Sequence, residues 1–191
     1  MVFNVVLKTN LFNENVLFNS LAEQMTIEEI NQISTSFQSN SVLILFISLF
    51  QPLIEILLIA VAINIGTLLL HYPLDFKAIL RVVTKSFLVF SLARIVFIIT
   101  LSYMSIRHMD ELVFIPQWSL ADLIGTKSIP AWALYPLQLA NVFQVLFIFL
   151  LAAGLNVLLP RGWSRWLLTV IATYGIGLVI LVLLIGFLTA L

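Results

Sequence analysis

Two ionisable side chains, Glu55 and Arg94, lie inside long apolar stretches of this 191-residue chain. A charge at membrane depth is costly, so such a residue is a candidate functional group. Glu55 lies thirteen residues from Val42, and Arg94 lies twelve residues from Ile106. These two ends of the apolar stretches are predicted to lie on the same side of the membrane. The helical rise converts these counts to roughly 18–20 Å. Antiparallel neighbouring helices would therefore bring the two charges level.

Two amides of a third apolar stretch, Asn141 and Gln144, come to a similar or slightly shallower depth. We therefore predict a candidate intramembrane polar cluster of Glu55, Arg94, Asn141 and Gln144. It could be a proton- or ion-coupled site, or an ion pair with amide partners that fixes helix register. Transporters usually carry more intramembrane carboxylates or broken helices, and only Gln51–Pro52 hints at a break here. The pattern favours the structural alternative.

Residue patterns typical of catalysis are missing from the sequence. It contains no HExxH, G-x-S-x-G, P-loop or GxGxxG pattern. The lack of cysteine excludes disulfides, thiolate metal sites and thiol nucleophiles. The two histidines, His71 and His108, fall at opposite predicted membrane boundaries, away from a partner base. We predict no enzyme activity and no catalytic, cofactor-binding or metal site.

Four apolar stretches are long enough to cross a bilayer, which takes about 20 helical residues. They are apolar on every face, whereas barrel strands would alternate, so they must be helices. With 62% hydrophobic residues, 9% charged residues and a mean hydropathy of +1.14, an ordinary soluble domain is excluded. The formal net charge of zero gives no indication of nucleic-acid binding. We predict an all-α, polytopic transmembrane helix bundle over residues 42–191, with spans at Val42–Leu70, Ser86–Ile106, Ala133–Leu159 and Trp166–Leu191.

Short helices are predicted around these spans. Residues 1–41 form a polar segment in which Thr26 and Glu29 fit a capping box. That box would open an amphipathic helix whose apolar stripe of Ile27, Ile30, Ile33 and Phe37 either packs on the bundle or lies on the membrane surface. Proline predicts a kink in the first span near Gln51–Pro52. A short helix with a Ser cap and a Gly stop is predicted over Ser119–Gly125.

Basic residues indicate how the chain is oriented. Lys77, Arg81 and Lys85 recur every four residues and form a candidate basic face on a surface helix that runs into the second span. With Arg161 and Arg165, five basic residues lie in the first and third loops, against three on the opposite side. The positive-inside rule then predicts that these loops are cytoplasmic and that both termini lie outside, in the plasma or inner membrane if the chain is bacterial.

The predicted fourth span carries Thr169, Thr173 and Gly177 at four-residue spacing. Small residues on one helix face permit close packing in lipid. The stripe could be an internal face of the bundle or a dimer interface, and the pattern favours the former.

Three soft motifs resemble the Yip1-like family of small polytopic membrane proteins. They are FKAILRVVTKSF before the second span, SLADLIG in the loop, and LYPLQLANVFQVLFIFLLAAGLNVLL in the third span. The resemblance covers roughly Pro52–Leu191. It implies no enzyme activity; eukaryotic members are linked to membrane trafficking with small GTPases, and no binding residues carry over. Family members usually have five spans and a cytoplasmic N-terminus, whereas this chain lacks a clear first span.

The function predicted from these features is a non-enzymatic integral membrane protein, a scaffold or accessory subunit. Its predicted partners are the lipid bilayer and either another membrane protein or a second copy of the chain, without nucleic acid and without a cofactor. The alternative is a small transporter or channel subunit that uses an intramembrane site at Glu55 and Arg94.

Overall fold

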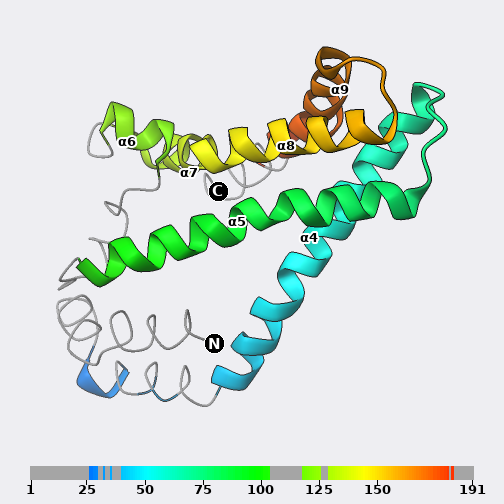
Figure 1. Cartoon of the computed structure of the whole chain (residues 1–191). Coiled ribbons are helices and arrows are strands. Elements are labelled where there is room, and N and C mark those ends of the chain that lie inside the picture. Colours follow the sequence, from blue (N-terminus) through cyan, green and yellow to red (C-terminus); the bar gives the residue numbers. More distant parts are fainter. Residues whose placement is uncertain are drawn as a thin grey trace. The chain divides into compact units, whose positions relative to one another are not determined.

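A computed structural model describes residues 26–29, 32, 35, 40–103, 118–125, 129–180 and 182. These residues form helices and connecting loops without a β-strand, and a single isolated bridge joins Ser119 to Asn141 (Figure 1). The chain divides into two compact units. The first unit comprises Met1–Gln51 and Arg94–Pro116, and the second comprises Pro52–Ala93 and Gln117–Leu191.

The predicted capping box at the N-terminal segment is confirmed. The Glu29 carboxylate accepts hydrogen bonds from the Thr26 backbone N–H at 2.8 Å and from the Thr26 hydroxyl at 3.0 Å. These bonds hold the pKa of the Glu29 carboxyl below its usual value, the backbone bond being the larger cause. Most of the apolar stripe predicted to follow, Ile30, Ile33 and Phe37, lies outside the described residues.

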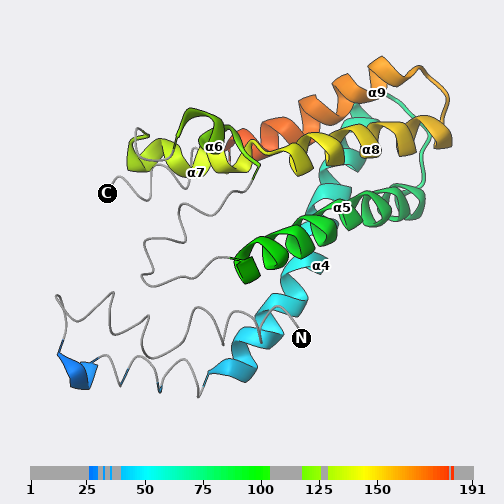
Figure 2. The ribbon, with the colours of Figure 1, turned by 60° about the vertical axis from the view of Figure 1, so that its left-hand side comes forward.

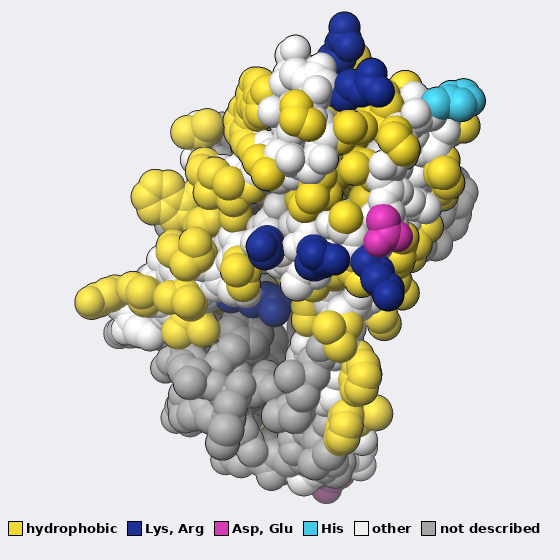
Figure 3. Space-filling view, turned by 45° about the vertical axis from the view of Figure 1, so that its right-hand side comes forward, with side chains coloured by type: hydrophobic (Ala, Val, Ile, Leu, Met, Phe, Trp, Pro, Cys, Tyr) yellow, Lys and Arg dark blue, Asp and Glu magenta, His cyan; other side chains and the backbone are white. Residues whose placement is uncertain are grey.

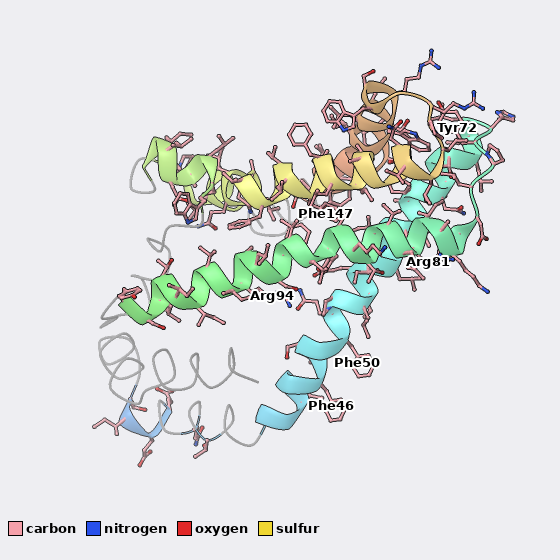
Figure 4. The ribbon with its side chains drawn as sticks, viewed as in Figure 1. Phe46, Phe50, Tyr72, Arg81, Arg94 and Phe147 are labelled. Carbon is pink, nitrogen blue, oxygen red and sulfur yellow. The ribbon has the colours of Figure 1, made fainter. Side chains whose placement is uncertain are left out.

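Helix α4 (Ser41–Leu69) is a single 29-residue helix that passes through Pro52. The boundary between the two units falls at Gln51 and Pro52, where the sequence predicts a kink. Phe46 and Phe50, one turn apart on its first part, stack with ring centroids 6.4 Å apart (Figure 4). The part from Phe46 to Leu69 is long and apolar enough to cross a membrane.

Helix α5 (Phe76–Tyr103) joins the predicted surface helix and the second span into one 28-residue helix. The predicted start of that span, Ser86, lies inside this helix, and where the helix enters the membrane stays a prediction. At its start the Asp75 carbonyl accepts hydrogen bonds from the N–H groups of Ala78 and Ile79. The helix continues to Tyr103 because the sequence between contains no Gly or Pro that would end it. Residues 104–117, with the predicted end of the second span and His108, lie outside the described residues.

The apolar face of the first turns of α5 packs inside the protein. Ile79, Val83 and Phe87 are buried in the hydrophobic core of the second unit. This apolar face is therefore covered by protein, and the basic face opposite is exposed as predicted. That the helix lies at a membrane surface stays a prediction.

The third predicted span, Ala133–Leu159, is divided into two helices, α7 (Ala131–Leu139) and α8 (Val142–Leu158). The backbone between them pairs with the segment that precedes α6 (Leu120–Ile124). Leu120 N–H donates to the Ala140 carbonyl and Val142 N–H donates to the Trp118 carbonyl, both at 3.0 Å. These bonds replace helical ones, so an uninterrupted third span is not formed.

The predicted short helix in the loop is confirmed as α6. Its cap residue, Ser119, donates from its backbone N–H at 2.8 Å and from its hydroxyl at 3.0 Å to the Asp122 carboxylate. Gly125 follows the last turn with φ of 93°, a conformation that favours glycine.

The last described helix begins at α9 (Trp163–Val170), three residues before the predicted start of the fourth span, because Gly162 adopts φ of 98° immediately before it. It continues through the π-helical segment η3 (Ile171–Gly175) to Ile180. With α4 and α5 it is one of three described helices long and apolar enough to cross a membrane, whereas α8 has 17 residues. The remainder of the predicted span, residues 183–191, lies outside the described residues.

The core of the second unit is formed by apolar side chains of α4, α5, α8 and α9, and α8 runs beside α9 (Figures 1 and 2). Two glycines allow their helices to approach closely. A Cβ at Gly66 would clash with the Thr173 side chain, and one at Gly154 would lie 2.5 Å from Val82 Cγ1. The fully buried side chains in this core include Ile63, Ile79, Phe147, Leu151, Leu155 and Trp166.

Candidate functional site

A part-buried polar contact of the second unit joins Gln144 of α8 to Tyr174 of η3. The Gln144 side-chain amide donates to the Tyr174 hydroxyl. The Phe147 ring lies 5.3 Å from the Tyr174 ring, edge to face, and the Phe90 ring lies 5.0 Å from the Phe147 ring. Figure 4 shows Phe147 on α8 above α5. The amide and hydroxyl therefore satisfy each other next to a cluster of aromatic rings, where an unpaired polar group would be costly.

Tyr174 is a site residue that the sequence reasoning missed. It lies within the predicted fourth span, but it is not part of the predicted stripe of Thr169, Thr173 and Gly177. A tyrosine inside an apolar span requires a partner for its hydroxyl when it is buried, and that requirement is the signal that could have found it.

Asn141 supports the backbone at the break between α7 and α8. Its side-chain oxygen accepts the Gln144 N–H at 2.8 Å, which makes Asn141 the N-cap of α8. Its amide nitrogen donates to the Gln138 carbonyl at 3.2 Å. Both ends of this side chain are thus used to hold the turn, and Asn141 and Gln144 come together through the cap.

Glu55 lies half-buried on α4, in the part of that helix that belongs to the second unit. Of the four residues of the predicted cluster, Glu55, Asn141 and Gln144 belong to the second unit, and the structure brings Asn141 and Gln144 together. Arg94, which is exposed on α5 (Figure 4), belongs to the first unit. The pairing of Glu55 with Arg94 stays a prediction.

A second candidate site is the basic end of the second unit, which we define as Lys77, Arg81, Lys85, Arg161 and Arg165. All five side chains are exposed. In Figure 3, Lys and Arg side chains gather on the face shown. The first three come from α5, and the other two flank the start of α9.

Tyr72 ties the two loops of the basic end together. Its ring packs edge to face on the buried Trp166 ring at 5.1 Å, and the Arg161 guanidinium carbon lies 5.6 Å from its centroid. The Trp166 indole N–H donates to the Leu159 carbonyl at 2.8 Å. The loop between α4 and α5 and the loop between α8 and α9 therefore meet at one end of the unit, as the predicted topology requires.

Within the described residues, no group of three or more His, Cys, Asp or Glu side chains is arranged to hold a metal ion. The buried side-chain nitrogen and oxygen atoms of the same residues all have hydrogen-bond partners. The polar side chains inside the second unit are thus accounted for by contacts with one another and with the backbone.

Comparisons with protein-family models, with curated proteins and with solved structures found no match for this chain. The resemblance to the Yip1-like family gains no support from them and remains a prediction from the sequence motifs.

Proposed function

We propose that this chain is a multi-pass integral membrane protein with four spans, which acts without catalysis as a scaffold or accessory subunit for partners in the bilayer. Three of its helices are long and apolar enough to cross a membrane. The 17 residues of α8 extend about 26 Å, which is at the lower limit for a span. The same proposal includes membership of the Yip1-like family, a cytoplasmic position for the first and third loops, and an external position for both termini.

The observation that carries the proposal is the apolar surface of α4. Among the side chains of α4 that the structure describes, twelve large apolar ones are exposed, on both sides of Pro52. An apolar surface of this extent marks a contact with lipid or with another protein in the membrane. The exposed side chains are Leu43, Phe46, Ile47, Phe50, Leu53, Ile54, Leu57, Leu58, Val61, Ile65, Leu68 and Leu69.

The polar residues inside the spans also support a structural protein. Asn141 caps α8, Gln144 binds Tyr174, and the hydroxyls of Thr169 and Thr173 donate to carbonyls one turn earlier at 2.9 and 2.8 Å. Each of these side chains has a role in holding a helix or a helix pair.

Site-specific photo-cross-linking in native membranes tests the scaffold role. A photoreactive phenylalanine analogue at Leu53 or Leu57, both exposed on α4, is expected to yield discrete adducts with one or a few membrane proteins. The same analogue at Leu123 of α6, which is 83% exposed and outside the candidate spans, is the matched control. Adducts with lipid alone at both α4 positions would contradict the proposal.

A second candidate function, ion- or proton-coupled transport, is favoured by the half-buried carboxylate of Glu55 within a candidate membrane span. A carboxylate within a candidate membrane span could hold a proton or a cation. Purified protein in proteoliposomes would then show a flux that Glu55→Gln abolishes and that Glu29→Gln, outside the spans, leaves intact. A flux unaffected by Glu55→Gln, or no flux across a panel of ions, would remove this candidate.

A further inference from the structure

We propose that the basic end binds the headgroups of anionic phospholipids. Lys77, Arg81 and Lys85 occupy one exposed stripe of α5 at four-residue spacing, so their backbone positions cover about 12 Å along the helix. Arg161 and Arg165 add two more exposed cations from the other loop. Asp75 is the one carboxylate in the sequence of the two segments 70–85 and 159–166.

Arg161 is the best-positioned of these cations. Its guanidinium lies over the Tyr72 ring, which is held in place by the buried Trp166. The loop itself is fixed where Gly162 N–H donates to the Asn156 side-chain oxygen at 3.2 Å. A planar guanidinium can donate two parallel hydrogen bonds to a phosphate, and a side chain that is already ordered loses less entropy on binding.

The position of these cations on the helices favours lipid over a soluble acidic protein. They lie at the start of α5 and α9, the ends of two candidate spans, where headgroups are found. Trp163 beside them is partly exposed and stacks on Phe149 at 5.5 Å, as expected for an aromatic ring at the membrane interface. The backbone of Lys85 lies roughly 14 Å from the start of α5. Its long side chain can extend along the helix toward the headgroups.

The competing explanation is that these charges only orient the chain during insertion. In that case the folded protein would not prefer anionic lipid. The proposal is independent of the scaffold role, because it concerns lipid binding by the folded chain whatever protein partners it has.

Lipid retention by the purified full chain separates the two explanations. The protein in neutral detergent is mixed with equal amounts of phosphatidylglycerol and phosphatidylcholine, and bound lipid is counted by native mass spectrometry. Wild type is expected to retain phosphatidylglycerol preferentially. Removing charge in Arg161→Gln/Arg165→Gln should weaken phosphatidylglycerol binding by about five-fold per charge removed.

Two controls distinguish loss of charge from loss of fold. Arg161→Lys/Arg165→Lys keeps both charges and should keep most of the preference. Lys8→Gln/Lys127→Gln removes two charges elsewhere in the sequence and should leave the preference unchanged. Circular dichroism checks that the helix content of every variant matches wild type.

Equal retention of the two lipids by wild type would overturn the proposal, as would an equal loss in the Lys8→Gln/Lys127→Gln control. So would an acidic protein that occupies the basic end in place of lipid, detected as a stable protein adduct that Arg161→Gln/Arg165→Gln releases.

Discussion

At the scale of single residues, the Gln144 amide and the Tyr174 hydroxyl each depend on the other for a hydrogen bond. Tyr174→Phe would leave the Gln144 amide unpaired, and Gln144→Leu would leave the Tyr174 hydroxyl unpaired. An unsatisfied buried group costs about 1–3 kcal/mol, so each single variant should be destabilised by an amount in that range. The double variant should cost less than the sum, with a coupling of about 1 kcal/mol.

Unfolding of the purified protein in mixed micelles measures these free energies. Tyr103→Phe is the matched control, because Tyr103 is 87% exposed and its hydroxyl is not buried. Strictly additive losses for Gln144 and Tyr174 would contradict the pairing.

Glu55 and Arg94 make a separate test. If they pair, Arg94→Leu or Glu55→Leu leaves the other charge uncompensated, which typically costs about 3–5 kcal/mol for a buried pair. The double variant Glu55→Leu/Arg94→Leu should then be milder than the sum of the single variants in the same unfolding assay. Additivity would show that the two side chains do not meet.

The Glu29 capping box gives a dependence on pH. Because the folded pKa of Glu29 lies below its usual value, the stabilisation from this box is present above the unfolded pKa of about 4.3 and is lost as the pH falls through the folded pKa. Thr26→Val removes the hydroxyl donor and keeps the backbone donor, so the Glu29 pKa should move part of the way back. The Glu29 pKa is measured by following the carboxyl chemical shift against pH by NMR. An unchanged pKa in Thr26→Val would contradict a contribution of the Thr26 hydroxyl to the lowered pKa.

At the scale of helices, close packing depends on Gly66 and Gly154. The opposing side chains, Thr173 and Val82, are β-branched and cannot turn away easily, and Thr173 is further fixed by its hydrogen bond to the Thr169 carbonyl. Gly66→Ala and Gly154→Ala should therefore each destabilise the second unit by about 1–3 kcal/mol.

Compensating substitutions make this test specific. Thr173→Ser removes the methyl group that would clash while keeping the hydroxyl, so Gly66→Ala/Thr173→Ser should recover most of the loss. Val82→Ala should do the same for Gly154→Ala. Gly177→Ala is the control, since a Cβ there meets nothing within 4 Å. Thermal unfolding that ranks Gly177→Ala with Gly66→Ala would refute the close-contact explanation.

The π-helical turn explains why one predicted stripe does not hold. Four-residue spacing predicts that Thr169, Thr173 and Gly177 share a face, but Thr169 is buried while Gly177 is exposed. A π-helical turn holds more residues than an α-helical turn, so η3 rotates everything after it relative to a regular helix. The prediction of an internal face is confirmed for Thr169 and wrong for Gly177.

At the scale of the whole molecule, topology is the main prediction. The cysteine-free chain allows single cysteines at Lys77, Asp122 and Arg161, all of which are exposed. With the predicted orientation, a membrane-impermeant thiol reagent added to intact cells should label only the cysteine at position 122. Labelling after permeabilisation is the control for reactivity. Labelling of positions 77 and 161 on intact cells would reverse the orientation.

The sequence predicted the helices and their approximate ends because apolar length and capping residues are local signals. It indicated α6 from Ser119 and Gly125, and it identified the exposed basic face of α5. It did not indicate the break at Ala140, since the bonds that hold that break come from Trp118 and Leu120, about twenty residues earlier in the chain. Tyr174 was missed for a related reason, because its role depends on a partner 30 residues away.

The separation between Gln144 and Tyr174 has a consequence for biosynthesis. The partners that close the break before α8 are already made when Ala140 leaves the ribosome, so this turn can form at once. The Gln144 amide can meet Tyr174 only after another 30 residues have been synthesised, which takes roughly 1.5–6 s at ordinary rates of translation. In a chain inserted as proposed, its amide would face the translocon or lipid without its tyrosine during that interval. Any factor that shields nascent polar groups would then have this stretch of the chain as a client.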